Sequence, residues 1–84
     1  MHYDVISCRA LEYLVLEVAF RDGLSGRVQI QPSHLTGVFE KLKDPSVFFK
    51  ANCNQGFVAW GEDLDLAPDA MYSAIRSHGS WVLS

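Results

Sequence analysis

The sequence predicts a two-layer α+β domain with a mainly antiparallel sheet of about five strands and two or three short helices. Three observations support this fold class. Segments within the first 31 residues alternate apolar and polar side chains, as half-buried strands do. Proline marks the expected starts of short helices, at Pro45 and Pro68. Gly79 stands where the second of these helices should end.

Length and composition predict a single folded domain. The chain has 84 residues, of which 49% are hydrophobic and 20% are charged, so an intrinsically disordered chain is excluded. No apolar run approaches the length of a membrane span. We therefore expect one domain over residues 1–84, whose last residues, 80–84, form an apolar tail.

Three strands are expected before residue 32. The first covers His2–Arg9 and ends in a connection at Ala10–Glu12. The second and third cover Tyr13–Phe20 and Leu24–Gln31, and each places its apolar residues on one face. Pro32 then ends the third strand, because proline has no amide hydrogen to donate.

The turn between the second and third strands follows from their patterns. A two-residue loop would pair apolar with polar residues, whereas a three-residue loop at 21–23 keeps all apolar residues on one face. This loop pairs Leu16 with Val28 and Glu17 with Arg27. Its last residue, a glycine, then takes the left-handed position of a turn with a bulge.

The remaining elements are shorter. Residues 33–43 are typical of a loop with one helical turn, and Asp44 should cap a helix that runs to about Lys50. Residues 51–54 and 57–60 are predicted to pair as a hairpin. The last helix should span Pro68–His78.

The cysteines indicate the cellular compartment. Cys8 and Cys53 lie in two different expected strands, and a small secreted scaffold usually carries four or more cysteines. The N-terminus also lacks the basic and apolar regions of a signal peptide. We expect a cytoplasmic protein with two buried reduced thiols; a disulfide between them is the alternative.

No motif predicts a metal, a cofactor or a catalytic residue. The acidic stretch Glu62–Asp65 lacks the glycine and the ligand spacing of a calcium-binding loop. The pair Ser33-His34 has no accompanying nucleophile elbow or oxyanion-hole motif. We therefore expect a protein that is not an enzyme.

Negative charge gathers late in the chain. The charges of residues 1–50 cancel, so residues 51–84 carry the whole net charge of −3. These later residues place Arg76 against Glu62, Asp63, Asp65 and Asp69. An acidic chain without a basic stripe is a poor nucleic-acid ligand, so we expect no autonomous nucleic-acid binding and favour a basic protein partner.

Aromatic and apolar residues supply further candidates for partner binding. Exposed aromatics mark interfaces, so Tyr13, Trp60 and Trp81 are the aromatics to examine for exposure. Trp81, Val82 and Leu83 form the best single candidate, since a terminal apolar segment can add a strand to a sheet or cover a subunit interface. Folding back over the chain's own core is an equally weighted alternative.

A series of motifs resembles one known family. The segments that carry this resemblance are Phe20–Gly23, Val28–Ile30, Val38–Pro45, Phe48-Phe49, Gly56–Trp60 and Asp65–Tyr72. Together they resemble domain-of-unknown-function family 2442, a family of small bacterial proteins, over about residues 2–73. The sequence departs from the family pattern at Gln29, where an acidic residue is usual, and at residues 61–63, where Pro-Asn-Gly is usual.

The resemblance implies a two-layer α+β domain without established catalytic residues. Members are often encoded beside a small partner protein and are suspected antitoxins. We therefore expect a non-enzymatic, antitoxin-like interaction module whose surface from Glu62 to Asp69 masks a small basic toxin. The alternative is a homodimeric or otherwise homo-oligomeric domain, or a ligand-binding domain, from a mobile-element or phage context.

Overall fold

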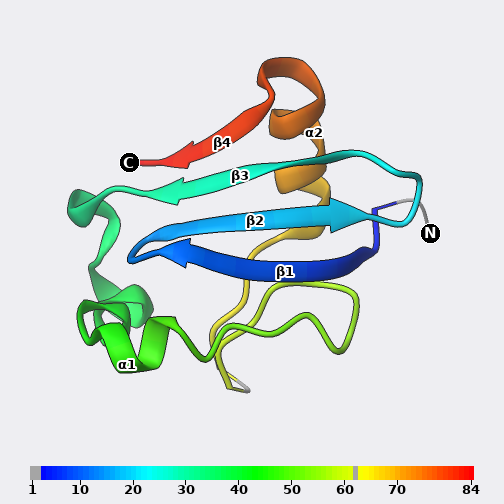
Figure 1. The fold of residues 1–84 in the computed structure, drawn as a ribbon. Coiled ribbons are helices and arrows are strands. Elements are labelled where there is room, and N and C mark those ends of the chain that lie inside the picture. Colours follow the sequence, from blue (N-terminus) through cyan, green and yellow to red (C-terminus); the bar gives the residue numbers. More distant parts are fainter. Residues whose placement is uncertain (1–2, 62) are drawn as a thin grey trace.

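The computed structural model describes residues 3–61 and 63–84. They form one mixed sheet, and the helices and loops cover one of its two faces (Figure 1). In chain order the elements are β1 (Val5–Glu12), β2 (Val15–Phe20), β3 (Ser25–Ile30), the 3-10 helices η1 (Pro32–His34) and η2 (Gly37–Lys43), α1 (Pro45–Phe48), α2 (Pro68–His78) and β4 (Ser80–Leu83). The predicted α+β class is confirmed. No helix in these residues is both long and apolar enough to cross a membrane.

The sheet has four strands in the order β1-β2-β3-β4, which corrects the expected five. β1, β2 and β3 are antiparallel, but β4 runs parallel to β3, so the sheet is mixed. The predicted hairpin at 51–60 is reduced to isolated bridges that join Ala59 to Asn52 and to Asp65. Beyond these bridges residues 51–60 form no strand, and Val58 and Trp60 are buried in the core.

The first strand lies later in the chain than predicted. The expected start at His2 falls outside the described residues, and the expected connection Ala10–Glu12 is part of β1. The chain instead turns at Tyr13 and Leu14, where Leu14 adopts a left-handed φ of 67°. Burial of the Leu14 side chain and a 2.9 Å hydrogen bond from the Ile30 N–H to the Leu14 carbonyl oxygen stabilise this conformation.

The register of β2 against β3 is confirmed. Leu16 faces Val28 and Glu17 faces Arg27, as the three-residue loop requires. Gly23 ends this loop with a φ of 97°, a conformation that glycine adopts without steric cost. The alternation of apolar residues therefore determined both the loop length and the buried face.

The start of α1 and both ends of α2 are as predicted, whereas α1 ends at Phe48, two residues before the expected Lys50. The Asp44 side chain accepts a 3.0 Å hydrogen bond from the Ser46 N–H at the start of α1. α2 spans the predicted residues and ends at Gly79, which has a φ of 81° and donates a 2.7 Å hydrogen bond to the Ile75 carbonyl oxygen.

The core lies between the inner face of the sheet, α2 and the loop that precedes α2. α2 contributes Met71, Tyr72 and Ile75, which recur at helical spacing. The other residues of the buried core cluster are Val5, Leu14, Leu16, Val18, Phe20, Val28, Ile30, Leu35, Leu42, Phe48, Val58, Trp60, Leu64 and Leu66. No charged side chain is buried in the part of the chain that the structure describes.

A close approach at Gly26 positions α2 on the sheet. A Cβ atom on Gly26 would lie 2.6 Å from Cγ2 of Ile75 and 2.7 Å from the carbonyl oxygen of Gly79. The end of α2 therefore packs directly against the backbone of β3. From Gly79 the chain enters β4 at once, so this contact also places β4 beside β3.

Substitution of Gly26 by alanine should destabilise the fold by about 1–3 kcal/mol, because the added methyl group meets a backbone oxygen that cannot easily move. Ser25→Ala is the matched control, since Ser25 is exposed on the same strand and its change should stay within about 0.5 kcal/mol. Urea unfolding measures both variants. Equal stability of Gly26→Ala and the native chain would contradict this account of the packing.

Candidate functional site

The acidic segment is partly neutralised by a residue from the first half of the chain. The Lys41 ammonium donates hydrogen bonds of 2.8 and 2.7 Å to the two carboxylate oxygens of Asp63. This pairing lowers the pKa of the Asp63 carboxyl below its ordinary value. Glu62 lies outside the described residues. The negative charge that gathers after residue 50 in the sequence is therefore partly neutralised in the folded chain by Lys41.

Two predicted acidic residues remain exposed without an ion pair to any described residue. Asp65 lies in the loop before α2, and its backbone forms an isolated antiparallel bridge with Ala59. Asp69 lies in the first turn of α2, where its carboxylate accepts a 2.9 Å hydrogen bond from the Ala70 N–H. These two carboxylates are the part of the predicted acidic surface that is exposed and has no ion pair to a described residue.

Trp60 is an internal residue rather than an exposed aromatic. Its side chain is only 3% exposed, and its indole Nε1–H donates a 2.9 Å hydrogen bond to the Phe48 carbonyl oxygen. This bond satisfies the end of α1 and ties it to the loop that carries the acidic segment. Trp60 thus positions the surface around Asp63 without presenting its own ring.

The apolar tail forms β4 and completes the sheet. Trp81 pairs with Val28 and Leu83 with Ile30, and both side chains are half-buried on the inner face. Val82 points to the outer face and is 49% exposed. Of the two alternatives for the tail, the structure shows the tail folded back onto the chain's own sheet. β4 is an edge strand, so its side that faces away from β3 pairs with no other strand of the sheet that the described residues form.

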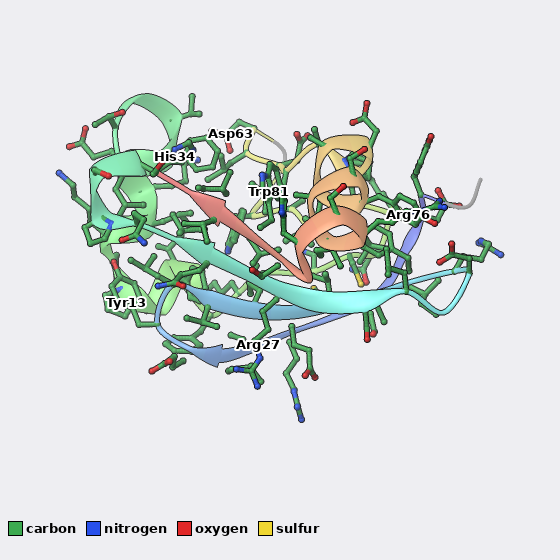
Figure 2. All side chains as sticks on the ribbon, turned by 90° about the horizontal axis from the view of Figure 1, so that it is seen from above. Tyr13, Arg27, His34, Asp63, Arg76 and Trp81 are labelled. Carbon is green, nitrogen blue, oxygen red and sulfur yellow. The ribbon has the colours of Figure 1, made fainter. Side chains whose placement is uncertain are left out.

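The outer face of the sheet was not singled out from the sequence. Figure 2 shows Arg27 pointing away from α2 and the loops, which gather on the opposite face. On this outer face Arg9 forms a 3.1 Å ion pair with Glu17, the residue opposite it on β2. The same alternation that identified the inner face also indicates these outward residues.

A hydrogen bond links two of the motifs that carry the family resemblance. The Tyr72 hydroxyl on α2 donates to the carboxylate of Asp22 in the β2–β3 turn, and this bond raises the pKa of Tyr72. The second oxygen of Asp22 accepts a 3.0 Å hydrogen bond from the Leu24 N–H. The tyrosine ring packs edge-on against Phe20. These contacts give both motifs a structural role.

The cysteines are free thiols and are half-buried rather than fully buried. Both pack against the core, Cys8 from β1 and Cys53 from the loop after α1. Burial, and next the neighbouring Cys53, raise the pKa of Cys8 from 9.0 to about 12. A thiol with so high a pKa is a poor nucleophile near neutral pH, since the thiolate is the reactive species.

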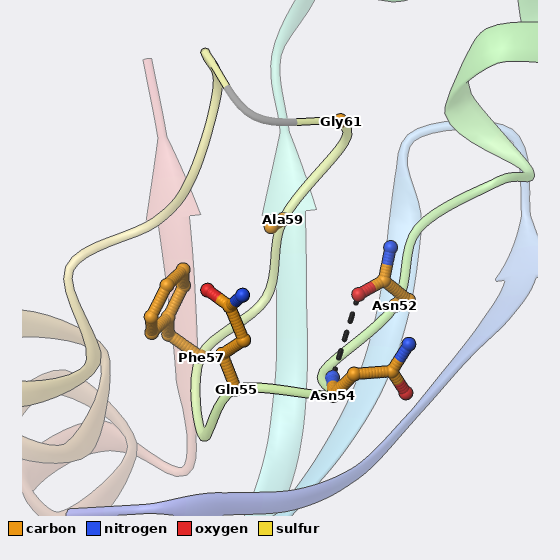
Figure 3. Close-up of a pocket in the computed structure, with 6 residues that line it drawn as sticks. All are labelled: Asn52, Asn54, Gln55, Phe57, Ala59 and Gly61. Carbon is orange, nitrogen blue, oxygen red and sulfur yellow. Dashed lines mark hydrogen bonds between the residues drawn. The ribbon is translucent and has the colours of Figure 1, made fainter.

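A polar hollow of about 380 Å³ lies on the loop between α1 and α2 (Figure 3). It is lined by Asn52, Asn54, Gln55, Phe57, Ala59 and Gly61. Figure 3 shows Phe57 and Gln55 on one side of the hollow and Asn52 and Asn54 on the other. Val58, Ala59 and Trp60 are all buried, so the exposed part of the lining comes mainly from the carboxamides and Gly61.

The chemistry of this hollow is neutral. Its carboxamides can donate and accept hydrogen bonds but cannot exchange protons near neutral pH. One acceptor is already used, since the Asn52 Oδ1 accepts a 3.4 Å hydrogen bond from the Asn54 N–H. Among the described residues no group of three His, Cys, Asp or Glu side chains could hold a metal ion. The hollow suits an uncharged polar ligand.

Comparison with known proteins identifies one family. The family model described as "Protein of unknown function (DUF2442)" matches residues 5–77, close to the range of the resemblance noted from the motifs. No curated protein and no solved structure matches the chain.

The raised pKa of Cys8 predicts a pH-dependent stability. The neutral thiol is favoured in the folded chain, so its contribution is fully present below pH 9.0 and is lost as the pH rises towards about 12. The free energy of unfolding of the native chain should therefore fall across this range relative to Cys8→Ser, whose hydroxyl does not titrate. Urea unfolding at several pH values measures the difference, and parallel pH profiles of the two proteins would refute the prediction.

Proposed function

The chain belongs to the DUF2442 family of proteins of unknown function, and on this premise we propose that it is a non-enzymatic, antitoxin-like interaction module. In this proposal it acts in the cytoplasm and binds a protein partner, a small basic toxin. The two free thiols are in keeping with a reducing compartment.

The uncovered outer face of the sheet is the observation that carries the proposal. A sheet face normally buries its apolar side chains against another layer. Here the helices and loops cover only the inner face, and Ile6, Leu11 and Val82 are exposed, the first two on β1 and the last on β4. A partner that docks on the sheet would bury this surface.

Electrostatics would add selectivity for a basic partner. The chain has a net charge of −3, and Asp65 and Asp69 are exposed without ion pairs to described residues. Asp63 is engaged by Lys41, so a partner lysine or arginine would have to compete for it. Because Asp65 and Asp69 both lie on the side of α2 and the loops, opposite the outer face, they would act at long range, mainly by speeding association and rejecting partners of like charge.

The proposal assigns no catalytic step. Several described carboxylates are used in structural hydrogen bonds rather than left as candidate acids or bases. Asp22 binds the Tyr72 hydroxyl, Asp44 caps α1 and Asp63 binds Lys41. Carboxylates that are held in such structural bonds are poorly placed to transfer protons to or from a substrate.

Co-expression with the product of the neighbouring gene, followed by co-purification, tests the proposal. We expect a complex whose affinity falls when Asp65 and Asp69 are both replaced by lysine, with a loss that shrinks as salt is added. Replacement of Ser33, Thr36 and Glu40 by lysine changes the net charge equally, at exposed positions off the sheet, and should leave binding nearly intact. Two proteins that never associate would remove this function.

The carboxamide-lined hollow favours a second candidate function, the binding of a small uncharged ligand. Nitrogen-15 NMR titration with adenosine and with N-acetylglucosamine should then shift the side-chain amide signals of Asn52 and Gln55 saturably. Gln55→Ala should weaken these ligand-induced shifts, whereas Gln29→Ala, at an exposed position on β3, should not. Unchanged spectra with both probes would exclude these two ligand classes.

A further inference from the structure

The two edges of the sheet differ in how they are protected. β1 carries register shifts in its pairing with β2, one between Val5 and Ser7 and one between Ala10 and Glu12. It also carries the charged Arg9, and its Val5 N–H donates a 2.8 Å hydrogen bond to the carbonyl oxygen of Gly56 in the loop. Bulges, charges and covering loops are the devices by which monomeric proteins block edge-to-edge pairing.

β4, at the other edge, has none of these devices. Its residues, Ser80–Leu83, include no charge and no proline, and their pairing with β3 is free of register shifts. Apart from contacts on the β3 side, no backbone hydrogen bond reaches β4 from the part of the chain that the structure describes. An apolar edge without protection is a template for a further strand.

The direction of one hydrogen bond shows which backbone groups of β4 face outward. The Leu83 carbonyl oxygen accepts a 2.7 Å hydrogen bond from the Gln31 N–H, so the peptide groups of Leu83 point towards β3. Alternation along the strand then turns the N–H and C=O of Val82 to the open side. The Val82 side chain is also exposed on the outer face.

We propose that β4 pairs antiparallel with β4 of a second copy of this chain, with Val82 opposite Val82. Across a two-fold axis the two valines would exchange both N–H···O bonds, and their side chains would meet on the outer face. Trp81 would lie opposite Leu83 of the second copy and extend the inner apolar face. The proposal goes beyond the function proposed above, because it concerns a second copy of this chain rather than a toxin.

A second copy suits this edge better than an unrelated strand. The register is self-complementary, as a two-fold interface requires, because Val82 is its own partner and Trp81 exchanges with Leu83. Each chain carries a net charge of −3, but β4 itself has no charged residue. Two copies of β4 can therefore pair without placing like charges opposite each other.

The expected dimer is weak. An edge of four residues buries less than the roughly 1,200 Å² of a stable interface, so dimerisation should depend on protein concentration. A test must therefore compare sedimentation or light scattering over a range of concentrations.

The experiment compares the native chain with Val82→Lys and Val38→Lys. Val38 is a matched control, because it is 59% exposed and lies on η2 rather than on a strand of the sheet. The native chain and Val38→Lys should dimerise with rising concentration, whereas Val82→Lys should dimerise at least about tenfold more weakly. Val82→Pro is a second variant, since it removes the outward N–H and leaves the bonds to β3 in place.

Each outcome decides the proposal. A native chain that stays monomeric throughout overturns self-pairing, as does a dimer that survives both substitutions of Val82 or one that Val38→Lys also abolishes. The function proposed above is judged separately by co-purification with the neighbouring gene product. A monomer that still captures this product leaves that function standing, and a dimer that captures nothing leaves only self-pairing.

Discussion

The absence of a side chain at Gly26 is the constraint on which the architecture depends. It lets Ile75 and the carbonyl oxygen of Gly79 approach the backbone of β3 more closely than any Cβ atom would allow. Because α2 is seated there, the chain leaves Gly79 beside β3 and continues as a parallel strand. The uncovered outer face and the unprotected edge at β4 both follow from this placement, and these are the surfaces to which we assign interactions.

The distribution of charge changes when the chain folds. In sequence, the negative residues gather after residue 50, yet Lys41 reaches Asp63 and pairs with it. The loop that carries Asp63 is held near Lys41 by Trp60, whose indole binds the end of α1. A buried aromatic residue and a surface ion pair thus act together, and the exposed negative charge is displaced towards Asp65 and Asp69.

Sequence reasoning succeeded where rules are local. The β2–β3 register followed from alternation, and the limits of α2 followed from Pro68 and Gly79. It failed where distant segments decide the outcome, since no local pattern shows that β4 pairs with β3. The turn at Leu14 was missed because a leucine seldom adopts a left-handed φ, and here burial in the core stabilises it. Trp60 was considered for partner binding because its burial depends on α1, which only the three-dimensional structure reveals.

The parallel pairing of β3 with β4 also has a consequence for synthesis of the chain. The β1–β2–β3 meander is contiguous and can form early, but β3 gains its second neighbour only after about fifty further residues have been added. At ordinary rates of translation this interval lasts roughly 3–10 seconds. During that time the nascent sheet exposes Val28 and Ile30 beside an open edge, so the growing chain passes through a stage with a greater tendency to aggregate than the finished protein.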